Sequence, residues 1–251
     1  FMTHVETSNG LENPIADIVG EAKKKGVISV VDSVCGIGGC KFNFDEIEAD
    51  IVFTGSQKAV GGIPGASLLS ISSRGLEVLQ SKKTPIRSYY LNLLRWNKVM
   101  DNPKRYLSTP STQVLIALRE ALRIIKEEGL EKRWIRHQIV ADALRNGITS
   151  LGLELVAEEE YRSNTVSAFY TPVDSAKIQA TMKDRFGIII ATGIGEGKER
   201  MLRIGHMANI SPKDVISCLS ALEISLKLHD VDVKRGAALD SATEIFEKNP
   251  T

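Results

Sequence analysis

Short apolar runs punctuate the first seventy residues of the chain. Residues 27–33, 51–53 and 66–72 form three such runs, as is typical of buried strands. Ahead of the first run, residues 13–26 carry apolar side chains at helical spacing. This succession predicts a mainly parallel sheet with helical crossovers. The third run follows the second too closely for a crossover, so we expect it to pair antiparallel.

The helix expected at residues 13–26 has a recognisable start and face. Asn13 is a residue type that caps helices, and Pro14 suits a first helical position. We therefore expect Asn13 to cap this helix. Its predicted buried stripe consists of Ile15, Ile18, Val19 and Ala22.

The second half of the chain is mostly helical in pattern. Residues 87–107 are mixed in character and predict an irregular connection. Two amphipathic segments follow, divided at Gly129. Their predicted stripes are Leu115, Leu118, Leu122 and Ile125 in the first, and Trp134, Ala141, Leu144, Ile148 and Leu151 in the second. We place a domain boundary here, giving a large domain at residues 1–128 and a smaller one at 129–251.

The smaller domain is predicted to be α/β. The expected elements are strands at residues 165–170, 188–192 and 201–204, a helix at 175–186 and a helix starting at Pro212. Ser211 and Asp214 give the last helix a capping start. Its predicted buried stripe is Val215, Leu219, Leu222 and Leu226.

Composition narrows the kinds of ligand. The 251 residues include 32 basic and 31 acidic side chains without long single-sign runs, and 43% are hydrophobic. This balance argues against nucleic acid or an acidic membrane surface as a partner and favours a small ligand. No apolar run reaches the roughly 20 residues of a membrane span.

Cysteine and histidine usage gives no metal or disulfide signal. The three cysteines are odd in number and lack the paired spacing of a zinc site, which favours a reduced, cytoplasmic setting. His137, His206 and His229 are scattered along the chain. We expect core or surface roles for these histidines.

The stretch at residues 54–59 carries the strongest chemical signal. Lys58 lies on a tight turn directly after an apolar strand, among small and apolar neighbours that solvate an ammonium poorly. Partial desolvation would lower the pKa of the amine and make it nucleophilic. Asp32 ends another strand, and open α/β sheets bind ligands at the carboxyl ends of their strands. We expect Asp32 and Lys58 to face one ligand, and pyridoxal phosphate requires such a pair of lysine and carboxylate.

Four phrases of the sequence carry a family resemblance: residues 3–10 (THVETSNG), 31–39 (VDSVCGIGG), 54–65 (TGSQKAVGGIPG) and 202–205 (LRIG). In order and spacing they resemble class V aminotransferases of the alanine-glyoxylate and serine-pyruvate kind. The resemblance implies the type I fold of pyridoxal-phosphate transferases, with pyridoxal 5'-phosphate as cofactor. It also implies a homodimer.

The resemblance further implies cofactor contacts beyond Asp32 and Lys58. Val34 would pack against the ring, Gln57 would reach the phosphate and Ser8 would lie near the ring hydroxyl. Ser8 and Gln57 have an alternative, since both can satisfy local backbone groups. Tyr106 and Thr109 resemble the residues by which a neighbouring subunit reaches the phosphate. Because Thr109 precedes a proline, it can instead be an ordinary helix cap.

Arg203 alternates with apolar residues on a predicted strand. A guanidinium there needs a carboxylate, either from an internal acidic residue or from the substrate. The resemblance favours the substrate. Gln57 stands where the related cysteine desulfurases have histidine before the lysine, which disfavours desulfurase chemistry.

The functional expectation is an aminotransferase. It would move an amino group between a small amino acid, such as alanine or serine, and a 2-oxo acid, such as glyoxylate or pyruvate. The alternatives are another reaction on the same cofactor, by a lyase or epimerase, and a non-catalytic subunit of the same fold. Because residues 1–5 resemble the middle of a strand, we also expect an N-terminal part, lost or carried as a separate fragment, that would supply further cofactor contacts.

Overall fold

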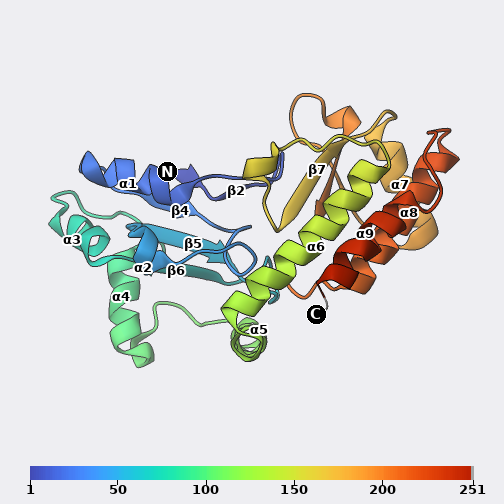
Figure 1. The fold of residues 1–251 in the computed structure, drawn as a ribbon. Helices are drawn as coiled ribbons and strands as arrows, with labels where there is room; N and C mark the ends of the chain where they lie inside the picture. The colour runs from blue at the N-terminus through green and yellow to red at the C-terminus, as the bar shows by residue number, and fades with distance from the viewer. Residues whose placement is uncertain (250–251) are drawn as a thin grey trace.

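The computed structural model describes residues 1–249, which form two lobes joined by a long helix (Figure 1). The elements of the first lobe are β1 (Met2–Thr3), β2 (Val5–Glu6), β3 (Leu11–Glu12), α1 (Ile15–Lys24), β4 (Val30–Asp32), α2 (Phe44–Ile47), β5 (Ile51–Gly55), β6 (Ser67–Ile71), α3 (Ser73–Ser81) and α4 (Leu93–Asp101). Helices α5 (Thr112–Glu128) and α6 (Leu130–Ser150) follow. The second lobe continues with β7 (Val166–Tyr170), α7 (Ser175–Phe186), β8 (Ala191–Thr192), β9 (Met201–Gly205), α8 (Pro212–Leu228) and α9 (Ala237–Lys248). Short 3-10 turns lie at Pro103–Arg105, Glu159–Tyr161 and Lys198–Arg200.

The first lobe is built on a four-stranded sheet in the order β1-β4-β5-β6. The first three strands are parallel, and β6 runs antiparallel to β5 with Gly55 opposite Ser67. The mainly parallel sheet and its antiparallel edge are therefore confirmed. Strand β4 begins at Val30, later than expected, because residues 26 and 27 are used to end α1. Gly26 lies in the left-handed region at φ 69°, and the amide of Val27 donates to the carbonyl of Ala22.

Helix α1 packs on the sheet through Ile15 and Val19, whereas Ile18 is 38% exposed. The expectation that Asn13 caps this helix is wrong. Pro14 occupies the cap position without a side-chain hydrogen bond, and Asn13 donates from Nδ2 to the carbonyl of Thr3. Asn13 therefore ties the start of α1 to strand β1.

The irregular connection expected at residues 87–107 is wrong in its middle, where α4 forms. Asn92 caps α4 by accepting from the amides of Leu94 and Arg95. Only Val99 of this helix is buried, so its sequence lacks a full apolar stripe. Helix α5 ends at Glu128, as the expected division at Gly129 requires, but Leu115 and Leu122 are nearly half exposed and Ala121 is its buried residue.

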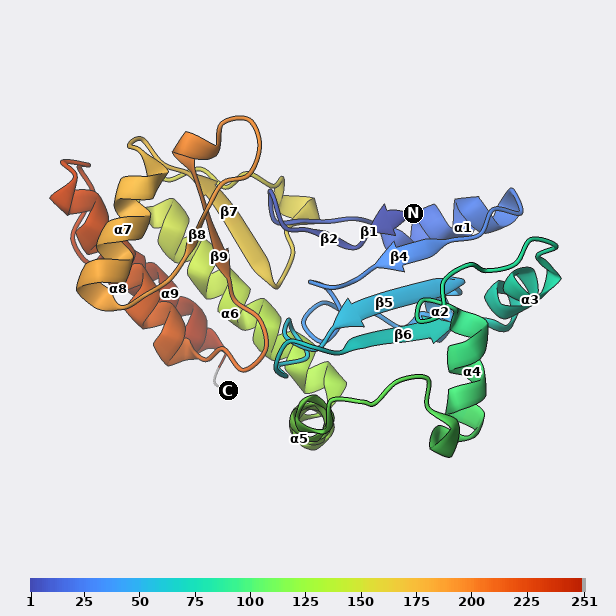
Figure 2. The same ribbon diagram turned by 180° about the vertical axis from the view of Figure 1, so that it is seen from behind.

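The second lobe pairs an antiparallel sheet, in the order β7-β9-β8, with α6 to α9 (Figure 2). Strand β8 is shorter than expected, while β7, β9 and α7 agree with the expected ranges. Ser211 and Asp214 form the capping box of α8. The predicted stripe of α8 is buried in the core with Phe169, Ile178 and Leu202.

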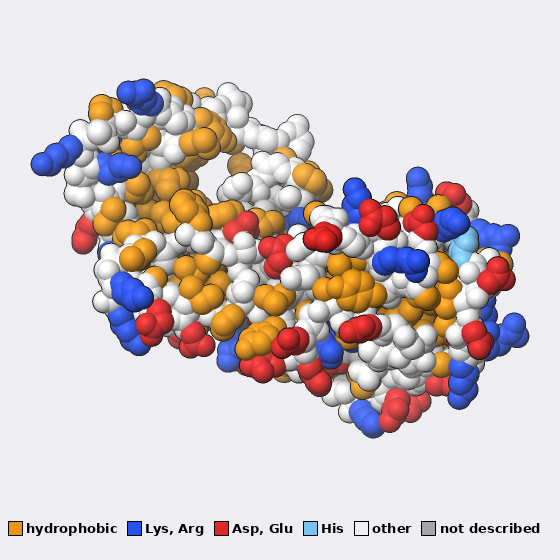
Figure 3. Space-filling view, turned by 90° about the horizontal axis from the view of Figure 1, so that it is seen from above, with side chains coloured by type: hydrophobic (Ala, Val, Ile, Leu, Met, Phe, Trp, Pro, Cys, Tyr) orange, Lys and Arg blue, Asp and Glu red, His pale blue; other side chains and the backbone are white. Residues whose placement is uncertain are grey.

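Charges of both signs are interspersed over the face drawn in Figure 3, as the balanced composition indicates. Among the helices of residues 1–249, none is both long enough and apolar enough to cross a membrane.

Candidate active site

Lys58 lies on a loop that leaves β5 and returns into β6. Ser56 closes this loop, because its amide donates to the carbonyl of Ala66 at 3.0 Å and its Oγ donates to the carbonyl of Ile63 at 2.6 Å. The amide of Gly62 donates to the Ser56 carbonyl at 2.7 Å, and the amide of Gly61 donates to the Lys58 carbonyl at 2.9 Å. The Lys58 side chain is half-buried. These bonds restrict the backbone from which the amine projects.

Asp32 is the last residue of β4, the parallel neighbour of β5, and it pairs in register with Phe53. Its Oδ1 accepts from the amide of Val34 at 2.9 Å, which fixes the carboxylate at the carboxyl edge of the sheet. The amide of His4 donates to the Asp32 carbonyl at 2.7 Å. The strand leading to Lys58 therefore lies beside the one that Asp32 ends.

The charges of Lys58 and Asp32 both affect the pKa of the Cys35 thiol. Burial raises the pKa of the Cys35 thiol; the Lys58 ammonium opposes this rise and the Asp32 carboxylate adds to it. Lys58 and Asp32 are thus both close enough to act on one thiol, at 5% exposure. The sequence-predicted pair therefore follows two adjacent parallel strands, and both groups influence the pKa of one thiol.

A buried polar network behind Asp32 was not predicted from the sequence. Ser33 Oγ and His4 Nδ1 are 2.7 Å apart, and His4 Nε2 lies 3.3 Å from Glu12 Oε1. His4 is 3% exposed. Gly36 is required beside it, since a Cβ on Gly36 would fall 2.1 Å from His4 Nδ1. The network therefore holds the turn that follows Asp32.

Arg203 bonds to backbone carbonyls rather than to a carboxylate. Its Nε donates to Thr192 at 2.9 Å and its Nη1 donates to Thr7 at 2.8 Å. Within residues 1–249 it makes no ion pair with an acidic side chain, so an internal acidic partner is not found. The half-buried guanidinium retains an Nη2 group with no hydrogen bond to this part of the chain.

The remaining cofactor candidates are more scattered. Ser8 lies in the same turn as Thr7 and donates from Oγ to Glu6 Oε1 at 3.0 Å, which is a local interaction. Val34 is half-buried and packs against the cluster of Val5, Cys35 and Cys40. Gln57 is exposed, and Tyr106 and Thr109 are exposed on the connection before α5. Thr109 does not cap α5, because Ser111 holds that position.

Two buried histidines form a second polar region. His137 and His206 are almost fully buried. Burial lowers the pKa of His137 to about 4 and that of His206 to about 3. His137 Nε2 and His206 Nδ1 have no hydrogen-bond partner among residues 1–249. Core roles for both, one of the two alternatives expected from the sequence, are confirmed.

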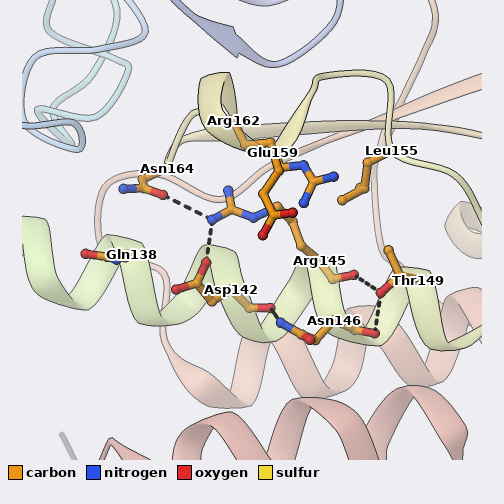
Figure 4. Close-up of a pocket in the computed structure, with 9 residues that line it drawn as sticks. All are labelled: Gln138, Asp142, Arg145, Asn146, Thr149, Leu155, Glu159, Arg162 and Asn164. Carbon is orange, nitrogen blue, oxygen red and sulfur yellow. Dashed lines mark hydrogen bonds and ion pairs between the residues drawn. The ribbon is translucent and has the colours of Figure 1, made fainter.

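A cavity of about 390 Å³ lies between α6 and residues 155–164 (Figure 4). Its Arg145 is already paired, with Asp142 at 2.6 Å and the Ser163 carbonyl at 2.7 Å. No group of three or more His, Cys, Asp or Glu side chains in the described chain is arranged to hold a metal ion.

The chain is similar in sequence and in structure to known aminotransferases. The family model described as Aminotransferase class-V matches residues 1–215. An uncharacterised aminotransferase of Methanocaldococcus jannaschii is 33% identical over 98% of the chain, and an alanine-glyoxylate aminotransferase of Oryctolagus cuniculus is 32% identical over 90% of it. The crystal structure of pyridoxamine-pyruvate aminotransferase from Mesorhizobium loti has a TM-score of 0.94 at 29% identity over 98% of the chain.

The similarity to the Mesorhizobium structure confirms the α/β fold class expected from the sequence. The chain spans 64% of the Methanocaldococcus protein, 60% of the rabbit enzyme and 64% of the Mesorhizobium structure. It therefore covers less than two thirds of the length of these relatives.

Proposed function

The chain belongs to the class V aminotransferase family, and from this premise we propose that the polypeptide carrying it is a pyridoxal-phosphate-dependent aminotransferase. The observation that carries the proposal is the placement of Asp32 and Lys58 at the carboxyl ends of adjacent parallel strands. Ligands bind at this edge in open α/β sheets. Both groups act on the same buried thiol, Cys35.

The residues present fit the cofactor. Asp32 uses Oδ1 to accept from Val34, and its Oδ2 accepts no hydrogen bond within residues 1–249. That oxygen can accept a hydrogen bond from a protonated ring nitrogen. Lys58 makes no ion pair with any described carboxylate, so its amine is available for covalent attachment. Bound pyridoxal phosphate would supply an electron-poor ring that stabilises negative charge at the substrate α-carbon.

Three residues of the chain would carry the other roles in the reaction. Lys58 Nζ would hold the cofactor. Once displaced by substrate, it would accept a proton from the substrate α-carbon as general base and deliver it to the cofactor's aldehyde carbon as general acid. Asp32 would keep the ring nitrogen protonated. Arg203 would orient the substrate carboxylate through the edge of the guanidinium not bonded to Thr192 and Thr7.

For the substrates, we propose a small amino acid, such as alanine or serine, with glyoxylate or pyruvate as acceptor. The support is the set of relatives, which includes serine-glyoxylate, alanine-glyoxylate and pyridoxamine-pyruvate aminotransferases. Ser8, Val34 and Gln57 remain the proposed cofactor contacts of this chain. Tyr106 and Thr109 are the proposed contacts made across a subunit interface.

We propose a homodimer as the assembly, with a second copy covering the face formed by residues 89–122. That segment exposes eight large hydrophobic side chains: Tyr89, Tyr90, Leu91, Met100, Tyr106, Leu115, Ile116 and Leu122. Exposed apolar groups concentrated in one segment are typical of an interface.

The domain division at residue 129 and the cytoplasmic setting also stand as proposals. The buried cores support the division, since one consists of residues between 140 and 246 and another of residues between 2 and 52.

The free, buried cysteines Cys35, Cys40 and Cys218 support a reducing compartment.

The test is product formation with alanine and glyoxylate. An aminotransferase yields matched pyruvate and glycine, whereas a lyase or epimerase does not. In parallel, borohydride reduction of the protein with pyridoxal phosphate should fix a label on Lys58, located by peptide mass. A protein that gives neither matched products nor a label on Lys58 would refute the proposal.

A further inference from the structure

Among the fully buried side chains of residues 1–249, Arg133 is the largest, at 0% exposure, and no sequence pattern singled it out. It lies in the first turn of α6. Each of its three nitrogens is bonded. Nε donates to the Gly38 carbonyl at 2.9 Å, Nη2 to the Ala59 carbonyl at 2.8 Å, and Nη1 to Glu128 Oε2 at 2.7 Å.

A buried arginine is costly for stability alone. Removing a guanidinium from water is only partly offset by one carboxylate, and hydrophobic replacements of buried ion pairs are often neutral or stabilising. Burial also lowers the pKa of Arg133, while Glu128 opposes this change. The presence of a buried arginine is better explained by its geometry, because the planar guanidinium can hold two backbone carbonyls at once.

The two carbonyls belong to the loops that carry the proposed chemistry. Ala59 follows Lys58 directly, and Gly38 lies in the second of two consecutive turns after Asp32, in which the amides of Gly39 and Cys40 donate to the Gly36 carbonyl. Gly38 lies at φ 95°, and a Cβ there would fall 3.0 Å from the Ala59 carbonyl oxygen. The loops thus touch, and Arg133 bonds to one carbonyl of each.

Glu128 extends the connection to the strand of Arg203. It accepts from Arg136 Nε at 2.6 Å as well as from Arg133. Arg136 in turn donates to the carbonyls of Ala208 at 3.0 Å and Ile210 at 2.9 Å. These residues follow β9. One carboxylate therefore orders two arginines that reach the Lys58 loop and the segment after Arg203.

We propose that Arg133 is a positioning residue that holds the Lys58 amine in register with Asp32 by clamping the Ala59 and Gly38 carbonyls. The proposal rests on the proposed function, because it assigns Arg133 a part in proton transfer by Lys58. Arg133 bonds to neither Lys58 Nζ nor the Asp32 carboxylate, so it would act on the position of the amine through the backbone.

The experiment compares Arg133→Met and Arg133→Lys with Arg145→Lys, in the polypeptide that carries this chain. Arg145 is the matched control: it is a buried arginine on the same helix, paired to Asp142 and to the Ser163 carbonyl. The first readout is hydrogen exchange in the cofactor-free protein. We expect the Gly61 and Gly62 amides to exchange about tenfold faster or more in Arg133→Met, with little change in Arg145→Lys.

The second readout is kinetic. With alanine and glyoxylate, Arg133→Met should lower kcat by about 30-fold or more and change KM by no more than about twofold, because binding groups remain in place. Substrate deuterated at the α-carbon should show a larger isotope effect on kcat than in the parent. Arg133→Lys should recover part of the rate, since its ammonium can reach one of the two carbonyls.

The outcomes separate the two claims. Equal kinetic losses in Arg133→Met and Arg145→Lys, or exchange that accelerates throughout the protein, would make Arg133 structural and overturn the proposal. If Arg133→Met does not fold, Arg133→Lys supplies both readouts. A parent without transaminase activity would overturn the proposed function, and exchange at Gly61 and Gly62 would then decide the clamp by itself.

Discussion

Arg203 Nη1 donates to the backbone carbonyl of Thr7 at 2.8 Å, across 196 positions of sequence. The bond joins β9 of the second lobe to the turn between β2 and β3. Four residues before Thr7, β1 ends at Thr3, which pairs in register with Asp32. The proposed substrate arginine is therefore tied by a short, hydrogen-bonded path to the proposed cofactor carboxylate.

Arg203→Lys should raise KM for both the amino acid and the oxo acid by about tenfold or more, equivalent to about 1.4 kcal/mol of lost binding per tenfold. A lysine cannot keep the Thr192 and Thr7 carbonyls and also present a planar fork to a carboxylate. Steady-state kinetics over both substrates measure this effect.

Arg162→Lys is the control for this change, since Arg162 is a half-buried arginine of the same lobe that donates to the Ala157 carbonyl. Its KM values should stay at the parent level. Unmoved KM values in Arg203→Lys would show that Arg203 serves only to join the two lobes.

Lys58→Ala should abolish transamination and leave the fold intact. The side chain is half-buried and makes no ion pair in the described chain, so its loss removes no core packing. Lys41→Ala, at an exposed position, is the control. Residual turnover near the parent level in Lys58→Ala, measured by pyruvate release, would remove Lys58 from the chemistry.

The positions of Lys58 and Asp32 could be predicted because they depend on local pattern. Each follows an apolar run, and parallel strands place their carboxyl ends together. Arg133 could not be predicted, because its partners Gly38 and Ala59 lie 95 and 74 residues away. No periodicity reports which backbone carbonyl a buried arginine will meet.

Helix α4 was not predicted, again because no hydrophobic period marks it. Its formation depends on the Asn92 cap and on a single buried residue, Val99, so the hydrophobic period that reveals other helices is absent. The second-lobe helices α7 and α8 were predictable, because full stripes face one core. A stripe of large apolar residues therefore predicts a helix better than a cap with one buried residue does.

Asp32→Asn should lower turnover by several orders of magnitude with little loss of stability. The amide oxygen can still accept from the Val34 amide, but a neutral group no longer holds a ring nitrogen protonated. Equilibrium unfolding together with kcat tests both halves of this expectation.

Asp50→Asn is the contrasting variant. Asp50 is 2% exposed, and its Oδ2 accepts from the amide and the hydroxyl of Ser29. Here we expect a loss of roughly 1–3 kcal/mol in the free energy of unfolding, with kcat unchanged. If Asp32→Asn lost stability and kept its rate, the two aspartates would have to exchange roles.

His137 and His206 should make the protein less stable in mild acid. Burial is the main cause that lowers the pKa of His137 to about 4 and of His206 to about 3. Arg136 and Arg133 add repulsion at His137, and Arg145 adds it at His206. In the unfolded chain both rings titrate near the ordinary value of about 6.5. Between that pH and the folded pKa values, the unfolded state binds more protons.

The free energy of unfolding should therefore be highest above about pH 6.5 and fall as the pH drops towards 4, by on the order of 3 kcal/mol for His137 alone. Urea unfolding at steps between pH 4.5 and 7.5 measures this, above the range in which most carboxylates titrate. Asparagine at either position cannot be protonated, so His137→Asn and His206→Asn should each flatten the slope, even though each variant starts from a lower stability. A slope that stays the same in both variants would mean that these rings are protonated in the folded protein, contrary to their burial.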